Sequence, residues 1–212
     1  SMSVDSEKFN RILKGLHELE PNEFMDSMRR VIYELPASAQ GFSDALSIGQ
    51  IKSKKWLVSN LRQLTKDTVD LGNVFVLAGW YGTLAWMLKR DPVFKIESIV
   101  NVDIDPHCER IAERLNKDWL SEWRFKAVTM DIRSIRYTDE PFAFPVWSKI
   151  KDDRVYHNKK ADTIICTSCE HIDDWESVYK QFPNDVLLVL QSNDLDIPEH
   201  INRPNNLKEF ED

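Results

Sequence analysis

"VFVLAGWYGTLAWML", residues 74–88, begins as a buried strand and continues as an amphipathic helix. The run 74–77 is short and apolar, as in a strand covered on both faces, and the apolar residues after Gly82 return at helical spacing. Gly79 and Gly82 stand at the join. Because glycine has no side chain, this pattern predicts a turn where a ligand can reach the backbone, or else a turn whose dihedral angles simply suit glycine.

The alternation of strands and helices continues to residue 192. Strands alternating with helices predict an α/β fold with a doubly wound, mostly parallel sheet, in which ligands bind at the carboxyl ends of the strands. The short tail after residue 192 leaves the sheet edge open, so an edge strand is brief, comes from the tail or is missing. The further strands are expected at 98–103, 125–131, 162–167 and 185–192, and the further helices at 106–120 and 173–182.

Residues 1–69 are expected to form a helical extension packed on a core of residues 70–212. Apolar residues recur there at spacings of three to four, which is typical of helices with one buried face. We expect the first helix to bury Phe9, Ile12, Leu13, Leu16 and Leu19. The helices are expected to begin near Asp5 or Ser6, at Pro21 and near Ser43, the second to end at Pro36, and the third to run to Thr65 with a break near Gly49.

Residues 132–161 interrupt the core without clear periodicity. They contain scattered aromatic residues, two prolines and, between Lys149 and Lys160, five basic residues against two acidic ones. A segment of this kind in a compact domain is typically functional or mobile. We expect this insertion to be a lid or an acceptor-binding segment.

Composition narrows the class of protein. The chain has 212 residues, 42% of them hydrophobic and 30% charged, as in one soluble globular domain with an appendage. Its net charge of −7 disfavours nucleic acid as a partner, since phosphate binding needs clustered Lys and Arg. No apolar run could cross a membrane and no secretory signal is recognisable, so we expect a cytoplasmic protein with reduced cysteines. The oligomeric state stays open.

Two acids follow predicted strands. Asp103 lies 21 residues after Gly82, at the end of the second strand, where a carboxylate can accept hydrogen bonds from both ribose hydroxyls of an adenosine ligand. Asp131 ends the third strand, where it could accept a hydrogen bond from an adenine amino group. The structural alternative for Asp131 is an ordinary turn or helix cap.

Over residues 70–192 the chain resembles the class I S-adenosylmethionine-dependent methyltransferases. "VFVLAGWYGTLA" resembles their first motif, "VNVDIDP" the second, "VTMDI" the third, and "ADTIICTSCEHI" the fourth strand with its catalytic end. The chain is also similar to short methyltransferase-like proteins of tailed phages. The resemblance implies a Rossmann-like fold and S-adenosyl-L-methionine as cofactor, bound by Gly79, Trp80, Tyr81, Gly82, Asp103, Ile104, Asp131 and Ile132.

The chain departs from the family pattern around the amino-acid end of that cofactor. Val76 replaces the acidic residue usual in the first strand, and Ala78 and Trp80 replace two glycines of the usual loop. The helix before the strand could supply a replacement through Gln50, Ser53 and Lys54, although simple solvent exposure explains such residues too. Trp80 and Tyr81 could line the sulfonium side, because an aromatic face attracts a cation, or Trp80 could pack under the loop.

The end of the fourth predicted strand is where the family places groups that touch the nucleophile. Glu170 and His171 are the titratable candidates for catalysis there, with a helix cap or plain exposure as the alternative for His171. Cys166 and Cys169 form a C-x-x-C pair without the further ligands of a zinc site, so we expect small, partly buried residues. Glu170 with Asn193 and Asp194 could hold a divalent cation, but we expect no metal.

The sequence therefore predicts an S-adenosylmethionine-dependent methyltransferase that acts on a small molecule. Three alternatives remain at this stage. One is another reaction of the same cofactor, such as aminocarboxypropyl transfer, cyclisation or cleavage to methylthioadenosine. The others are a nucleic-acid methyltransferase and a non-catalytic binding protein that has kept the fold.

Overall fold

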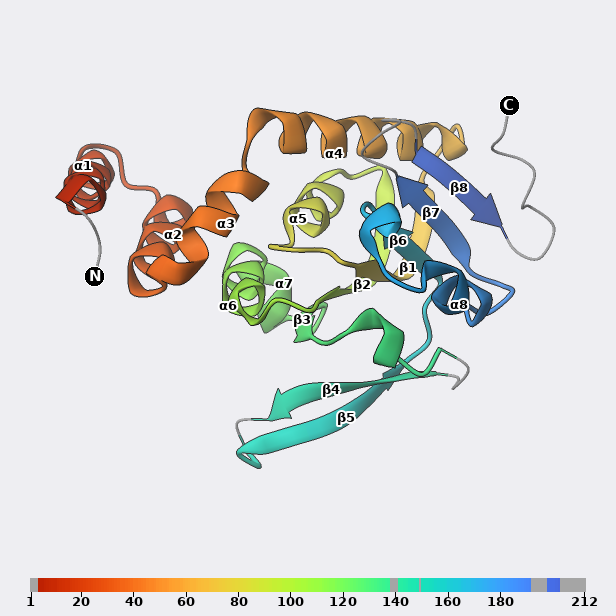
Figure 1. Ribbon diagram of the computed structural model, residues 1–212. Helices are drawn as coiled ribbons and strands as arrows, with labels where there is room; N and C mark the ends of the chain where they lie inside the picture. Colours follow the sequence, from red (N-terminus) through yellow and green to blue (C-terminus); the bar gives the residue numbers. More distant parts are fainter. Residues whose placement is uncertain (1–3, 138–140, 149, 192–197, 203–212) are drawn as a thin grey trace.

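A computed structural model describes residues 4–137, 141–148, 150–191 and 198–202. Its centre is a six-stranded sheet in the order β3-β2-β1-β6-β7-β8, in which all strands are parallel except β8 (Figure 1). This arrangement confirms the predicted doubly wound, mostly parallel sheet. The strands are β1 Val69–Leu77, β2 Phe94–Asp103, β3 Phe125–Thr129, β6 Thr163–Cys166, β7 Leu187–Gln191 and β8 Pro198–Asn202.

Strand order reverses between β1 and β6. From β1 the chain moves outward through β2 and β3 on one side, and then returns to place β6 and β7 on the other. A crevice forms at such a reversal, because the connections leave the two neighbouring strand ends in opposite directions. The antiparallel edge strand β8 comes from the tail, which is one of the three arrangements left open by the sequence.

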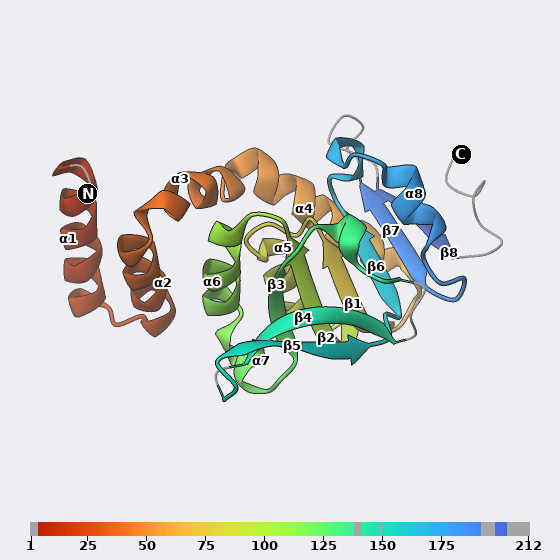
Figure 2. The same cartoon turned by 60° about the horizontal axis from the view of Figure 1, so that its bottom comes forward.

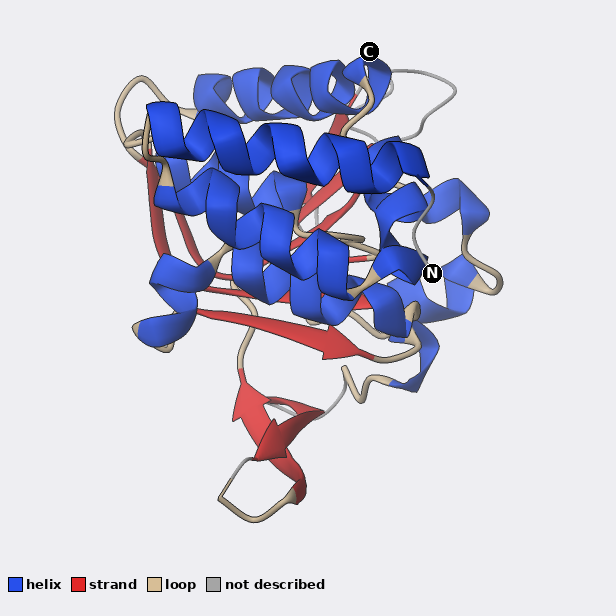
Figure 3. Ribbon diagram, turned by 90° about the vertical axis from the view of Figure 1, so that its left-hand side faces the viewer, coloured by secondary structure: helices blue, strands red, loops and turns tan. Residues whose placement is uncertain are grey.

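Helices cover one face of the sheet. Helix α4 Ile48–Leu61 lies across it beside α5 Thr83–Arg90 (Figures 1 and 3). Leu57 and Leu61 pack there against Val74 and Val76 of β1, while the alternate residues of the strand face the other side. The remaining helices of the α/β part are α6 Pro106–Leu115, α7 Lys117–Ser121 and α8 Trp175–Lys180, with short 3-10 turns η2 Ile132–Ser134 and η3 Cys169–His171.

The other face is covered by a β-hairpin together with α8, whose Val178 lies in the same core cluster. The predicted insertion forms β4 Phe142–Ser148 and β5 Asp153–Lys159, which pair with each other and not with the main sheet (Figure 2). Phe142 and Phe144 meet Phe75 of β1 edge-on, with ring centroids 5.1 and 5.7 Å apart. The apolar side chains of β4 thus belong to the core under the sheet, and the expected role of the insertion as a lid or an acceptor-binding segment stays a prediction.

The helical extension is present, with different boundaries. It consists of α1 Val4–Leu19, α2 Glu23–Glu34, α3 Pro36–Ala45 and α4, followed by η1 Arg62–Leu64. Pro36 is the first residue of α3, a position where the missing N–H costs nothing. The break predicted near Gly49 lies just before α4, where Ser47 caps the helix by accepting from the Gln50 N–H. The division of the chain into two units stays a prediction.

Helix α1 does not bury the face that its sequence predicts. Phe9, Ile12, Leu16 and Leu19 are between 54 and 82% exposed. Its contact with α2 is polar instead, with Arg29 donating to Asn10 Oδ1 at 2.8 Å. The periodicity predicted the helix correctly, but no described element covers its apolar side. None of the described helices is long and apolar enough to cross a membrane.

Candidate functional site

The loop after β1 is a tight turn with unusual backbone angles. Ala78 and Trp80 both have φ of 53°, and Gly82 has φ of 76°. The Gly82 N–H donates to the Gly79 carbonyl at 3.1 Å, and the Gly79 N–H donates to Val102 of β2 at 3.0 Å. Non-glycine residues rarely adopt a positive φ, and such strain is typical of functional loops.

Two buried asparagines explain the two glycines. A Cβ at position 79 would collide with the Asn101 amide, whose Nδ2 donates to the Trp80 carbonyl at 3.2 Å. A Cβ at position 82 would lie 2.9 Å from Asn116 Nδ2, which donates to the Gly82 carbonyl at 3.3 Å. The glycines therefore make room for the protein's own side chains, and the positive φ of Gly82 agrees with the alternative that the turn's dihedral angles suit glycine. Access of a ligand to this loop stays a prediction.

Asp103 connects this loop to β2. Its Oδ2 accepts from the Trp80 N–H at 2.8 Å and its Oδ1 accepts from the Asp105 N–H at 2.9 Å. Burial raises the pKa of Asp103, and these backbone hydrogen bonds oppose the rise. Each carboxylate oxygen has a second lone pair, so Asp103 can still accept a hydrogen bond from a ligand hydroxyl.

A cavity of about 230 Å³ lies at the carboxyl ends of β1, β6 and β7, beneath α4. It occupies the reversal of strand order, where the fold predicts a ligand. Pockets that enclose a drug-sized ligand measure about 300–1,000 Å³, so this cavity fits only part of one. Its lining residues are Gln50, Ser53, Lys54, Val76, Ala78, Gly79, Trp80, Leu84, Thr167, Ser168 and Gln191.

Lys54 is the cation of this cavity. The residue is 6% exposed, and its Nζ donates to Gln50 Oε1 at 3.2 Å. Burial lowers its pKa, and among the described residues no carboxylate lies within ion-pair distance. A buried ammonium without an anionic partner is costly, which is typical of sites that receive an anion.

The structure brings four of the predicted cofactor residues together in this cavity: Gln50, Lys54, Gly79 and Trp80. Gln191 supports them from β7, because its Nε2 donates to the Ser53 carbonyl at 3.2 Å. The sequence reading missed Thr167, Ser168 and Gln191 as lining residues. Their positions at the ends of predicted strands were the available signal.

Tyr81 and Ile132 do not face the cavity. Tyr81 is 1% exposed and packs among α2, α3 and α6, against Phe42 at 5.3 Å between ring centroids. Its predicted place on the sulfonium side is corrected, because the turn directs this ring into the helical extension. The Ile132 side chain is buried in the core cluster on the hairpin side of the sheet, and its predicted contact with the cofactor stays a prediction.

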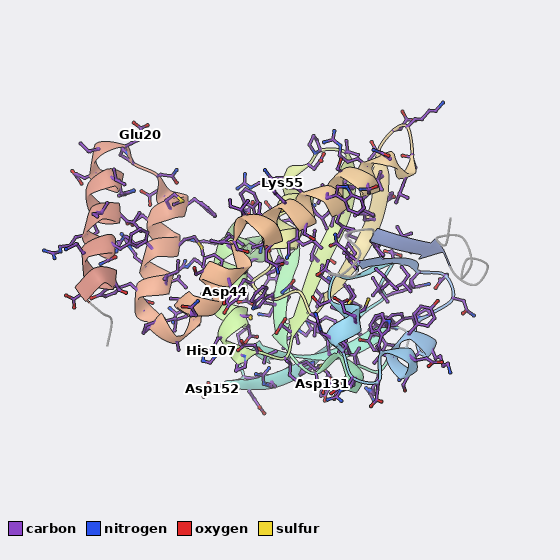
Figure 4. All side chains as sticks on the ribbon, turned by 45° about the horizontal axis from the view of Figure 1, so that its top comes forward. Glu20, Asp44, Lys55, His107, Asp131 and Asp152 are labelled. Carbon is purple, nitrogen blue, oxygen red and sulfur yellow. The ribbon has the colours of Figure 1, made fainter. Side chains whose placement is uncertain are left out.

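The remaining edge residues differ in their availability. Asp131 accepts from the Arg133 backbone N–H at 2.9 Å, which caps η2, and pairs with the Arg133 guanidinium at 2.7 Å. The hydrogen bond from the Arg133 side chain lowers the pKa of Asp131. Figure 4 labels the Asp131 side chain. Ile104 is 65% exposed next to Asp103, where it offers an apolar surface. The adenine role of Asp131 stays a prediction.

Glu170 and His171 lie in η3, beyond the cavity lining. Their side chains approach to 3.4 Å between His171 Nε2 and Glu170 Oε1. Thr167 and Ser168, which line the cavity, connect them to β6. The predicted catalytic pair is thus adjacent to the cavity along the chain, and its role stays a prediction.

The cysteines give no sign of a metal or redox centre in the described residues. All three are free, and burial raises the pKa of the Cys166 thiol. No three His, Cys, Asp or Glu side chains gather around a metal position in the described ranges. Asn193 and Asp194, named as possible cation ligands, lie outside those ranges.

Neither the comparison with protein-family models nor the search of curated proteins gives a match. Solved structures do match. A proposed S-adenosyl-L-methionine-dependent methyltransferase from Methanococcus maripaludis aligns with 72% of this chain and 61% of its own, at 16% identity and a TM-score of 0.51. The chain has the class I methyltransferase fold. A proposed sarcosine dimethylglycine methyltransferase from Galdieria sulphuraria also aligns, with 66% of this chain and 45% of its own, at 17% identity and a TM-score of 0.46.

The predicted resemblance is therefore confirmed at the level of the class I methyltransferase fold. This chain spans less than two thirds of each of these two structures, at 61% and 45% of their lengths. Within this methyltransferase fold, the first predicted motif forms the loop at Gly79, and the second contains Asp103 at the end of β2. The activity remains to be argued from these residues.

Proposed function

We propose that the protein is an S-adenosylmethionine-dependent methyltransferase that acts on a small molecule. The observation that carries the proposal is the cavity beneath α4, where Lys54 lies buried beside the loop of Gly79 and Trp80. It lies at the strand-order reversal of a methyltransferase fold, with Asp103 at the neighbouring strand end. The loop of Gly79 and Trp80 is thus flanked by Lys54, a cation that could bind a carboxylate, and by Asp103, a carboxylate that could bind a ribose.

The charges of Lys54 and Asp103 complement the carboxylate and the ribose hydroxyls of the cofactor. A ligand carboxylate is the partner that the Lys54 ammonium lacks among the described residues, and Gln50 already orients that ammonium. Asp103 retains lone pairs for the ribose hydroxyls, and exposed Ile104 offers an apolar surface to the base. When bound, the cofactor supplies an electrophilic methyl group. Trp80 would line the cavity wall near it.

Catalysis would rest mainly on position. Methyl transfer needs in-line approach of the nucleophile, so holding the acceptor provides most of the acceleration. A base is needed only where the acceptor carries a proton, and Glu170 with His171 would remove it near the end of β6. Thr167 and Ser168 supply hydroxyl groups between that pair and the cavity.

We infer a small-molecule acceptor and not a nucleic acid. Two lysines at the end of the basic segment are engaged by other side chains: Lys160 pairs with Asp185 at 2.8 Å, and Lys159 donates to Ser98 Oγ at 2.9 Å. Burial lowers the pKa of Lys159. A continuous run of free cations, which phosphate binding needs, is therefore not formed by these two lysines.

The test is direct binding by calorimetry with S-adenosylhomocysteine, and with adenosine as the partial ligand. We expect micromolar or tighter binding of the former, weaker binding of the latter, and a rise in melting temperature with S-adenosylhomocysteine. Binding of neither, with no thermal shift, would remove the methyltransferase assignment and leave a non-catalytic protein with this fold.

Val76 favours a second reaction class. It places an apolar side chain in the cavity wall, with Leu84, where the family has an acid. Altered contacts around the amino-acid end could direct attack to the aminocarboxypropyl carbon, or lead to cyclisation or cleavage. Chromatography of the adenosine product separates the two classes, because methyl transfer leaves S-adenosylhomocysteine and these reactions leave methylthioadenosine.

A further inference from the structure

The cavity beneath α4 has one sign of charge. Lys54 is its cation, and none of the described lining residues is acidic. The other polar members are neutral: Gln50, Ser53, Thr167, Ser168 and Gln191. The apolar wall consists of Val76, Leu84 and the Trp80 ring on the loop side. An amino acid carries a carboxylate and an ammonium. The described lining offers a counter-charge to the carboxylate and none to the ammonium.

A carboxylate gains more here than an ammonium could. The Lys54 ammonium is buried, and among the described residues its hydrogen-bond partner is the neutral amide of Gln50. A carboxylate placed beside it would supply the missing counter-charge, and charge-assisted hydrogen bonds are the strong ones. An ammonium would meet a like charge in a place of low dielectric, where repulsion is poorly screened.

The Gln50 side chain holds the Lys54 ammonium in position. Helix α4 places Gln50 and Lys54 one turn apart, so that the amide oxygen accepts from Nζ. The amide holds the ammonium in the cavity without neutralising it. Gln191 in turn donates to the Ser53 carbonyl and so connects this part of α4 to β7.

We propose that the cavity recognises the carboxylate of the cofactor's amino-acid end and is indifferent to its α-ammonium. The protein therefore binds S-adenosyl ligands that have a carboxylate and no amino group as well as those that have both. This inference rests on the proposed function, since the cavity must receive that end of the ligand. It extends that function by naming which charge sets ligand choice.

The test compares four ligands by calorimetry on the full chain. S-adenosylhomocysteine carries both groups, and 5′-S-(3-carboxypropyl)-5′-thioadenosine carries the carboxylate alone. The third ligand, 5′-S-(3-aminopropyl)-5′-thioadenosine, carries the amine alone, and methylthioadenosine carries neither. We expect the carboxylate ligand within about threefold of S-adenosylhomocysteine, and the amine ligand at least about tenfold weaker and no tighter than methylthioadenosine.

A variant assigns the preference to one side chain. Lys54→Gln removes the charge and keeps a polar group, so it should weaken the carboxylate ligand by about tenfold and leave methylthioadenosine within about twofold. The matched control is Lys55→Gln, the same change at the next residue, which is exposed on α4 (Figure 4). It should leave the affinities of all four ligands unchanged.

The outcomes separate this inference from the proposed function. Binding of S-adenosylhomocysteine with a tenfold loss for the carboxylate ligand, or with the amine ligand equal to it, would overturn carboxylate selectivity and leave the function standing. Failure of all four ligands would overturn the function itself. The comparison on the unaltered protein decides the matter even where Lys54→Gln does not fold.

Discussion

The backbone N–H of Trp80 donates to Asp103 Oδ2 at 2.8 Å, so the acid at the end of β2 holds the loop that follows β1. The two strand ends are already coupled by the hydrogen bond from Gly79 to Val102 at 3.0 Å. One carboxylate thus has two tasks, because it orders a strained turn and faces the edge where a ribose is expected.

Asp103→Asn should weaken S-adenosylhomocysteine binding by about tenfold or more. Asparagine has one acceptor oxygen, so it keeps only one of the hydrogen bonds from Trp80 and Asp105, and a charge-assisted hydrogen bond to the ribose, about 1.5–3 kcal/mol, is lost. Calorimetry measures the affinity, and a thermal melt shows whether the loop's support survived. Unchanged affinity in a folded variant would exclude the ribose role.

Asp131→Asn should change the same affinity by less than about threefold, within the range of surface substitutions. The Asp131 carboxylate is engaged by the Arg133 guanidinium and backbone, so a ligand would have to compete for it. Calorimetry compares the S-adenosylhomocysteine affinity of this variant with that of Asp103→Asn. A loss as large as that of Asp103→Asn would support the adenine role predicted from sequence.

Gly79→Ala should cost about 2 kcal/mol of unfolding free energy, because its Cβ collides with the Asn101 amide. The cost should shrink in an Asn101→Ala background, where that amide is gone. Denaturant unfolding of the two single variants and the double variant gives the coupling energy. An equal cost of Gly79→Ala in both backgrounds would show that Asn101 is not the reason for the glycine.

Lys54→Met should stabilise the ligand-free protein at neutral pH by about 1 kcal/mol while weakening ligand binding. Burial lowers the pKa of Lys54 in the folded state below its ordinary value of 10.5. At a pH below the folded-state pKa the lysine is charged in both states, and the folded state bears the full cost of burying it. Between the two pKa values the unfolded state binds more protons, so stability rises with pH.

The advantage of Lys54→Met should therefore be largest at neutral pH and shrink as the pH approaches 10.5. Chemical denaturation across that range measures it. Lys55→Met is the control, and should stay within about 0.5 kcal/mol of the parent because Lys55 is exposed. An advantage that grows with pH would contradict the burial of a charged lysine.

Local pattern predicted the sheet, the loop and the helix that carries Lys54, because strand and helix periodicities are properties of neighbouring residues. It did not predict why Gly79 is a glycine, since Asn101 lies on another strand and only the fold brings the two together. It also misplaced Tyr81, because the turn's positive φ angles decide which way that ring points. The prediction that α1 buries its apolar face was wrong, because periodicity identifies an apolar face but does not show whether another element covers it.

The hairpin was hidden from the sequence for a similar physical reason, and it allows a last prediction. Phe142 is fully buried and meets Phe75 and Tyr137 edge-on, with centroids 5.1 and 5.2 Å away. Phe142→Leu should cost about 1–1.5 kcal/mol of unfolding free energy through poorer packing. Ligand affinity should stay the same, because no residue of β4 or β5 lines the described cavity.

Tyr156→Ala on the same hairpin is the matched control. Tyr156 is 68% exposed, so the stability and the ligand affinity of the variant should stay close to those of the parent protein. If the hairpin acted as a lid, the exposed tyrosine would be the residue to meet the acceptor, and its loss would raise KM without changing the melting temperature. A cover for the sheet gives the reverse pattern, in which Phe142→Leu alone lowers the melting temperature and neither variant changes KM.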